Sequence, residues 1–262
     1  GMGRNAIKEV PCLPGTEQMD VVALERQLAN SQAPGKIVIA SAGTVTGTDF
    51  DDLTQISRLC KAHGAWLHID AAFGLFSRLV PEYQSLTEGI NEADSITCDG
   101  HKWLNVPYDC GIFFTKHAAL LQRTCSVSAP YLAVSDALPA LMDRGIENSR
   151  RFRALLVWMS LKSYGKRGYR DLVSRNCEQA KMFADWITKS SSYTLLTPCK
   201  LNVVVFRPSN STMEIQQKLA EINQTGLVYL TPGNWLGTPC IRAAFSNWRT
   251  SQADIDVVCS AL

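Results

Sequence analysis

His68-Ile69-Asp70-Ala71-Ala72 and, further along the chain, Asp99-Gly100-His101-Lys102-Trp103 are the two stretches that decide the fold. Each contains or follows a short apolar run, at residues 65–69 and 95–98, of the length typical of a buried strand. Ligand-binding side chains collect in the loops beyond the strand ends of a largely parallel sheet. We therefore expect Asp70, His101 and Lys102 to meet at one site, together with the loop that contains Thr44 and Val45.

The sequence around these stretches predicts an α/β protein with a mixed, mostly parallel sheet. Residues 37–40 and 65–69 are expected to be strands on either side of an amphipathic helix at 50–63, which Gly64 closes. The other elements expected in this part are a short strand at 8–12, helices at 19–29, 149–163 and 169–189, and strands at 95–98 and 111–114.

The end of the chain predicts a separate, smaller α+β unit. Its expected strands are residues 201–206, 227–230 and 240–245, and its expected helices are residues 212–223 and a last helix from 252. We place the boundary between residues 1–190 and residues 191–262.

Composition argues for a small-molecule ligand in a reducing compartment. The chain has 262 residues, 46% of them hydrophobic and 19% charged, and a formal net charge of +2, which favours neither nucleic acid nor an anionic membrane. Its nine cysteines form no C-x-x-C pair and its four histidines are dispersed, so we predict no metal site. With no secretory segment and no long apolar run, we expect free thiols and a cytoplasmic location without membrane contact.

Lys102 and Asp70 are the residue types that pyridoxal phosphate chemistry requires. A lysine amine forms the Schiff base with the cofactor aldehyde, and a carboxylate at the pyridine nitrogen keeps that nitrogen protonated, so that the ring accepts electrons. A single lysine or aspartate at these positions is usually a surface or turn residue. The ordered pair of motifs, each at a strand end, favours the functional interpretation.

These motifs resemble the group II pyridoxal-phosphate-dependent amino-acid decarboxylases, which include the aromatic-amino-acid and glutamate enzymes. The resemblance rests on the stretches at residues 66–72 and 101–104 and on Gly43-Thr44 before Phe50-Asp51. It continues through residues 108–111, 149–155 and 164–165 to Ile241-Arg242 and residues 254–256, and so covers essentially the whole chain.

The resemblance implies a role for each matching residue. Lys102 would form the Schiff base, Asp70 would pair with the pyridinium, Ala72 would pack against the ring, and His101 would lie near the phosphate. Thr44 and Val45 would border the ring, although the family commonly has a threonine where this chain has Val45. Tyr131 resembles the mobile-loop tyrosine that protonates the substrate carbon after carbon dioxide leaves; an ordinary packing role is the alternative.

The resemblance also implies the fold-type-I transferase architecture and a homodimer. Residues 1–190 would then be part of the large cofactor-binding domain with bridging helices, and residues 191–262 the small C-terminal α+β domain. The family's upstream phosphate-binding loop and ring-stacking aromatic residue have no counterpart before residue 40. We therefore expect the chain to represent part of a longer decarboxylase.

The expected activity is decarboxylation of an L-amino acid, an aromatic one first, to the amine and carbon dioxide. Two alternatives remain open: an oxidative or transaminating pyridoxal phosphate enzyme of the same fold, and a truncated, non-catalytic homologue. Arg150, Arg151 and Arg153 are expected to form structural ion pairs. Arg242 could face either the site or solvent.

Overall fold

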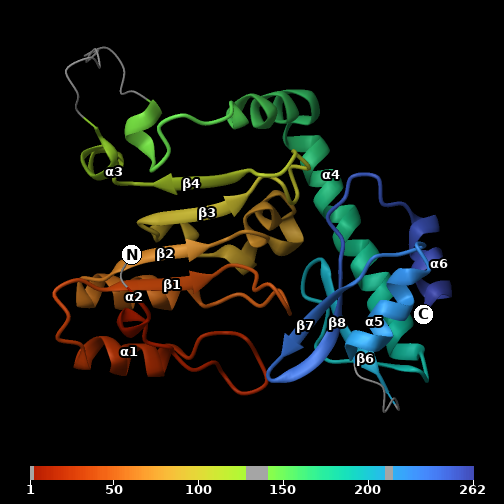
Figure 1. The fold of residues 1–262 in the computed structure, drawn as a ribbon. Helices are drawn as coiled ribbons and strands as arrows, with labels where there is room; N and C mark the ends of the chain where they lie inside the picture. Colours follow the sequence, from red (N-terminus) through yellow and green to blue (C-terminus); the bar gives the residue numbers. More distant parts are fainter. Residues whose placement is uncertain (1–2, 128–140, 210–214) are drawn as a thin grey trace.

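Two four-stranded sheets joined by a long helix make up the protein (Figure 1). The computed structural model describes residues 3–127, 141–209 and 215–262. The first sheet has the strand order β1 (Ile37–Ser41), β2 (Trp66–Asp70), β3 (Ser95–Asp99) and β4 (Gly111–Thr115). Strands β1 to β3 are parallel and β4 runs antiparallel to β3, so the predicted mixed, mostly parallel sheet is confirmed.

Two amphipathic helices, α1 (Val21–Asn30) and α2 (Leu53–His63), pack against one face of this sheet. Asp20 and Asp52 accept hydrogen bonds from the first backbone N–H groups of these helices, which fixes where each begins. Leu24 of α1 and Ile56 of α2 join Val38 and Ile69 of the strands in one buried cluster. Alternate residues of β1 and β2 thus form the core of the large unit.

The opposite face of the first sheet carries exposed apolar side chains. Ile37 and Ile39 of β1 are 55% and 62% exposed, and Phe113 of β4 is 49% exposed. The register places Ile39 beside His68, and Phe113 beside Thr97, on this same face. Parallel sheets are normally covered on both faces, so this face is an open apolar surface of the described part.

Six short helical segments of the large unit lie before, between and after its strands within the described residues. They are η1 (Arg4–Ala6), η2 (Gly74–Leu79), η3 (Pro81–Thr87), η4 (Ile90–Glu92), α3 (Ala118–Cys125) and η5 (Leu141–Arg144). The sequence analysis did not predict any of these six segments.

A long helix, α4 (Arg153–Lys189), runs from the large unit to the small one (Figure 1). Its backbone is non-helical at Gly165, which has a positive φ of 59°. The two helices expected at residues 149–163 and 169–189 are therefore confirmed as the two parts of α4 on either side of Gly165. Glycine tolerates the left-handed φ that breaks the helix there.

The second sheet is wholly antiparallel, with the order β5 (Tyr193–Leu195), β6 (Val203–Pro208), β8 (Thr238–Ala244) and β7 (Thr231–Trp235). Two helices, α5 (Ile215–Gln224) and α6 (Gln252–Ala261), complete this unit, and Leu219 and Ile255 contribute to its core. A small α+β unit is therefore confirmed. The boundary at residue 190 stays a prediction.

Two expected strands are wrong. Residues 8–12 contribute only an isolated bridge from Cys12 to Met19. Residues 227–230 form no strand, and Leu227 and Tyr229 are 66% and 82% exposed. The strand that follows, β7, contains Pro232 and Gly233, which the edge position in the sheet tolerates.

No helix within the described ranges is both long enough and apolar enough to cross a membrane. All nine cysteines lie in described segments, and each is a free thiol.

Candidate active site

Asp70 occupies the carboxyl end of β2, at the edge where the three parallel strands end. Its neighbours across the sheet are Ser41 of β1 and Thr97 of β3. The carboxylate Oδ1 accepts a hydrogen bond of 3.0 Å from the backbone N–H of Ala72, and the side chain is exposed. Most of its hydrogen-bonding capacity therefore remains available to a ligand.

Lys102 lies in the turn after β3, and two groups hold its ammonium. Its Nζ is 3.0 Å from Oδ2 of Asp99, at the end of β3, and 4.1 Å from the centre of the Phe73 ring. The lysine side chain is 22% exposed. A carboxylate on one side and an aromatic face on the other fix the direction of a side chain that would otherwise rotate freely.

His101 lies beside Lys102 and shares the carboxylate of Asp99. Its Nε2 is 3.5 Å from Oδ2 of Asp99, and its ring packs against the tilted ring of Tyr108 with 4.0 Å between ring centres. Its Nδ1 lies 3.1 Å from the carbonyl oxygen of Cys110. The imidazole is thus fixed on three sides at the same edge of the sheet.

Asp99 and Phe73 are site residues that sequence reasoning missed. Asp99 belongs to the lysine motif, but the resemblance implies no catalytic or cofactor-binding role for it. The signal was its spacing: a side chain three residues before Lys102 can reach back across a tight turn. Phe73 directly follows the Asp70-Ala71-Ala72 motif, and this position is the sequence signal that could have identified it.

Thr44 and Val45 lie in the loop of residues 43–49 after β1. The Thr44 hydroxyl donates to Oε2 of Glu17 and accepts from the backbone N–H of Asp49. The side chain of Val45 is 64% exposed. The loop begins next to Asp70, because the backbone N–H of Ala42 donates to the Asp70 carbonyl at 2.7 Å. Their contact with the cofactor stays a prediction.

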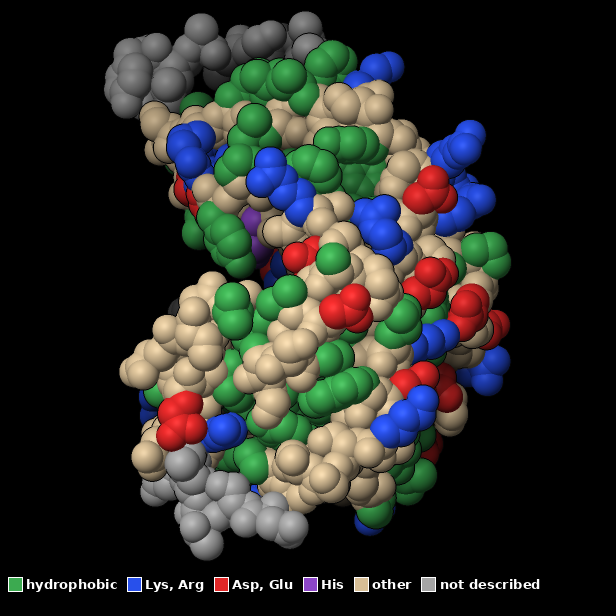
Figure 2. Space-filling view, turned by 90° about the vertical axis from the view of Figure 1, so that its right-hand side faces the viewer, with side chains coloured by type: hydrophobic (Ala, Val, Ile, Leu, Met, Phe, Trp, Pro, Cys, Tyr) green, Lys and Arg blue, Asp and Glu red, His purple; other side chains and the backbone are tan. Residues whose placement is uncertain are grey.

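Ala72 is half-buried directly after Asp70, in the turn that leads to Phe73. Tyr131 lies outside the described residues. The structure therefore brings Asp70, Ala72, Lys102 and His101 to the edge where β2 and β3 end, which is the edge that the sequence predicts. Figure 2 looks onto this side and shows a hollow between the upper and lower parts of the molecule.

His68 lies two residues before Asp70 on the same face of β2. Its Nδ1 is 2.8 Å from the Ser95 hydroxyl oxygen, and its ring stacks on Phe113 at 6.4 Å between centres. Burial lowers the pKa of His68, and the nearby Asp70 carboxylate opposes this only in part. The neutral imidazole is therefore favoured next to the Asp70 carboxylate.

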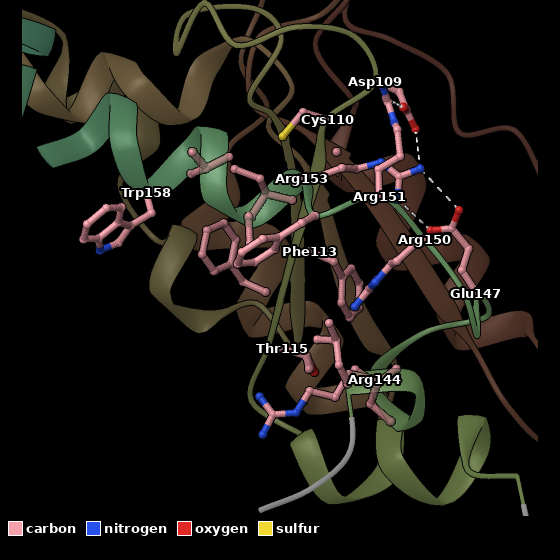
Figure 3. A pocket seen from close by; sticks show the side chains of 18 of the residues that line it. Asp109, Cys110, Phe113, Thr115, Arg144, Glu147, Arg150, Arg151, Arg153 and Trp158 are labelled. Atoms are coloured by element: carbon pink, nitrogen blue, oxygen red, sulfur yellow. Dashed lines mark hydrogen bonds and ion pairs between the residues drawn. The ribbon is translucent and has the colours of Figure 1, made fainter. Parts of the chain in front are cut away.

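A separate pocket of about 1040 Å³ lies along β4, between α3 and the start of α4 (Figure 3). Phe113 and Val157 are among its apolar lining residues, and Arg144 and Arg150 among its basic ones. None of the predicted site residues that the structure describes lines it. Its shape and chemistry are therefore distinct from those of the edge that carries Lys102.

The arginines at the start of α4 are largely structural, as expected. Arg151 and Arg153 both pair with Asp109, and Arg153 also pairs with Glu147 at 3.0 Å. The hydrogen bond from Arg153, followed in weight by the one from Asp109's own backbone and that from Arg151, lowers the pKa of Asp109 to about 2. These pairs hold the loop before β4 against the helix.

Arg242 is half-buried on β8, where its Nη1 donates to the Thr231 hydroxyl at 3.1 Å. Its Nε is buried without a hydrogen-bond partner among the described residues. A position facing solvent does not describe this half-buried side chain, and a position facing the site stays a prediction.

Known proteins resemble the chain along most of its length. Residues 2–209 match the pyridoxal-dependent decarboxylase conserved domain. An aromatic-L-amino-acid decarboxylase of Bacillus atrophaeus is 32% identical over 253 residues, which are 91% of this chain and 53% of the relative. The histidine decarboxylase of Mus musculus is 32% identical over 238 residues, which are 89% of this chain and 36% of the relative.

Solved structures share the fold. Tryptophan decarboxylase of Catharanthus roseus, in complex with L-tryptophan, matches with a TM-score of 0.86 and 25% identity, covering 100% of this chain and 56% of that one. This likeness shows the fold-type-I architecture of pyridoxal phosphate decarboxylases. The chain belongs to the pyridoxal-dependent decarboxylase family, and its cofactor is pyridoxal phosphate. It spans about half the length of the bacterial relative.

The residues at this edge fit the cofactor by their donor chemistry. Lys102 offers a primary amine, and Asp70 offers a carboxylate that only one backbone N–H engages within the described ranges. His101 adds an imidazole next to the same oxygen of Asp99. The edge therefore contains the amine and the ring carboxylate that pyridoxal phosphate requires.

Proposed function

We propose that the protein decarboxylates an L-amino acid, with an aromatic amino acid as the first choice, to the amine and carbon dioxide. The placement of Asp70 and Lys102 at one edge of a parallel sheet is the observation that carries the proposal. The names of the relatives, which act on aromatic amino acids, histidine or tryptophan, support the substrate class.

Pyridoxal phosphate, when bound, supplies a ring that accepts the electrons of the bond to the departing carboxylate. Asp70 would hold the proton on the ring nitrogen, because its carboxylate is exposed at the edge. Asp99 would orient the Lys102 amine and hold or accept its proton, since Oδ2 lies 3.0 Å from Nζ. His101, 3.5 Å from the same oxygen, would share that proton.

Borohydride reduction tests the role of Lys102 directly. The protein incubated with pyridoxal phosphate and reduced should carry the cofactor on Lys102, as peptide mass spectrometry would show. Lys102→Ala should lose both the label and amine formation. Lys116→Ala, at an exposed lysine after β4, should keep both. A label that persists in Lys102→Ala would contradict the assignment.

Product analysis separates the alternatives. Amine with an equal amount of carbon dioxide supports decarboxylation, whereas an aldehyde with peroxide, or a keto acid, would indicate the oxidative or transaminating enzyme. A protein that binds no pyridoxal phosphate would be the non-catalytic homologue. The same assays on several amino acids would test the preference for aromatic substrates.

We propose Tyr131 as the proton donor to the substrate carbon, on the basis of the resemblance alone. Tyr131→Phe should lower amine formation while leaving the borohydride label on Lys102 unchanged. Amine formation equal to that of the unmodified protein would remove Tyr131 from the mechanism.

We also propose that the protein forms a homodimer in the cytoplasm. The open apolar sheet face around Ile39 supports self-association, because large exposed apolar patches mark interaction sites. The nine free thiols favour a reducing compartment. Light scattering coupled to size exclusion would measure the mass, and a monomer at all concentrations would contradict the dimer; cell fractionation would test the location.

A further inference from the structure

The loop of residues 43–49 is held between the start of the chain and the small unit. From the first side, Oε2 of Glu17 accepts the Thr44 hydroxyl and the backbone N–H of Gly47, the latter at 2.8 Å. In return, the backbone N–H of Glu17 donates to Oδ2 of Asp49 at 2.7 Å. One acidic residue thus binds the loop at three points.

The small unit holds the same loop from the other side. Nζ of Lys200, in the segment before β6, pairs with Oδ1 of Asp49, whose side chain is fully buried. The Trp235 ring at the end of β7 packs on Gly47 so closely that a Cβ there would lie 2.3 Å from a ring carbon. The loop therefore has almost no room to move.

Glu17 also interacts electrostatically with two cations of the small unit, Lys200 and Arg242. Burial lowers the pKa of Lys200 and that of Arg242, and the Glu17 carboxylate opposes both shifts. Glu17 is therefore, in addition to Asp49, a negative charge that acts on two half-buried cations of the small unit. An alanine at this position would remove the side-chain hydrogen bonds to the loop as well as the favourable electrostatic interaction with both cations.

The residue before the loop, Ala42, is hydrogen-bonded through its backbone to the turn that carries Asp70. The backbone N–H of Ala42, just before the loop, donates to the Asp70 carbonyl, and the Ala42 carbonyl accepts from the backbone N–H of Gly74 at 3.0 Å. A shift of the loop would therefore be transmitted to the turn that presents Asp70. Displacements of this kind are costly in ligand sites, where geometry must be held closely.

We propose that Glu17, with the Asp49–Lys200 pair, is a positioning residue that fixes the 43–49 loop and thereby the Asp70 carboxylate for the cofactor. The proposal rests on the proposed function for its cofactor readout. Its structural half concerns the loop alone and can be tested without cofactor.

Hydrogen exchange of the cofactor-free protein tests the structural half. Glu17→Ala should speed exchange of the Gly47 and Asp49 amides at least tenfold, because the first loses its acceptor and the second depends on the Thr44 hydroxyl that Glu17 orients. Glu17→Gln, which keeps an acceptor oxygen, should stay within a few-fold of the unmodified protein. Glu25→Ala, at an exposed glutamate of α1, is the matched control. Unchanged exchange in Glu17→Ala would overturn the proposal.

Pyridoxal phosphate titration, followed by the absorbance of the bound cofactor, tests the positioning half. Glu17→Ala should weaken binding about tenfold, which corresponds to roughly 1.4 kcal/mol, and Glu17→Gln should restore most of it. Combining Glu17→Ala with Lys200→Met should weaken binding less than the sum of the single effects, because both act through one loop. Faster exchange with unchanged affinity would overturn the positioning role. If the unmodified protein bound no cofactor, the proposed function would fail, while the exchange data would still decide whether Glu17 fixes the loop.

Discussion

Gly74 lies where the turn after β2 crosses the end of β1, and a side chain there would collide with backbone. A Cβ atom would lie 2.1 Å from the carbonyl oxygen of Ala42 and 2.6 Å from the Phe50 ring. The close approach lets the Gly74 N–H donate to that same carbonyl oxygen. The turn that carries Asp70 is thus anchored to the neighbouring strand by a contact that only glycine permits.

Gly74→Ala is expected to lower the free energy of unfolding by about 1–3 kcal/mol, because fixed backbone atoms must shift to admit the methyl group. Chemical denaturation of the cofactor-free protein would measure this. Gly111→Ala is the matched control, since a Cβ at Gly111 meets nothing within 4 Å. Equal stability of the two variants would contradict the close contact.

His68 gives the protein a predictable dependence on pH. Burial lowers its pKa from the model-peptide value of 6.5, so the unfolded chain takes up a proton on this imidazole at a higher pH than the folded protein does. The contribution of His68 to the free energy of unfolding is fully present above pH 6.5. It is lost as the pH falls through the lowered pKa of the folded protein. Acid therefore destabilises the fold through this residue.

The free energy of unfolding, measured between pH 7.5 and about 5, should fall less steeply in His68→Gln than in the unmodified protein. His63→Gln, at the end of α2, serves as the comparison. If the pH profile of His68→Gln matched that of the unmodified protein, burial of His68 would not be the cause.

At the scale of elements, α4 supports the turn that carries Lys102. Trp103, which is fully buried, donates from its Nε1 to Oδ1 of Asn176 on α4 at 3.1 Å. Asn105 continues the contact, because its Nδ2 donates to the carbonyl oxygen of Ser246, just after β8. The lysine turn is therefore attached to both units of the molecule.

Asn176→Ala should destabilise the protein by about 1–3 kcal/mol, because it leaves the Trp103 N–H buried without an acceptor. Ser174→Ala, which removes an exposed hydrogen bond to Glu178 on the same helix, should have little effect. Thermal unfolding of the two variants would measure the difference. A destabilisation as large in Ser174→Ala would show that general helix weakening is responsible.

The sequence predicted those elements whose local pattern is strong. The apolar runs of β1, β2 and β3 and the amphipathic spacing of α2 indicate their structure without tertiary information, and the order of the two motifs placed Lys102 and Asp70 at one edge. The short helices between residues 74 and 92 lack a sustained helical period. The sequence did not predict β7, because Pro232 and Gly233 are uncommon in strands. The edge position of β7 in the sheet permits both residues.

Site residues that act across long stretches of chain could not be predicted in this way. Glu17 meets Thr44, and Asp49 meets Lys200, because the fold brings together three separate segments. A single sequence contains no local pattern for such contacts. Asp99 was within reach of sequence reasoning, since it stands three residues before Lys102, but its spacing alone does not distinguish a turn residue from a partner of the lysine.

At the scale of the whole molecule, α4 belongs to two hydrophobic cores. Its middle part, from Tyr169 to Cys177, packs with Trp103 of the large unit and with Leu201, which lies before β6. Its last turns contribute Phe183 and Ile187 to the core of the small unit. Neither unit therefore has a complete core without part of this helix.

A fragment that contains the small unit should fold only if it includes the last turns of α4. A fragment of residues 191–262 would lack Phe183 and Ile187 and should be unfolded by circular dichroism, whereas a fragment of residues 178–262 retains them and should give a cooperative thermal transition. A folded 191–262 fragment would show that the helix is dispensable for the small unit. The small unit that can fold by itself thus begins within α4, a few turns before the end of the helix. A chimera that exchanges this unit with that of a relative should therefore join the two sequences there.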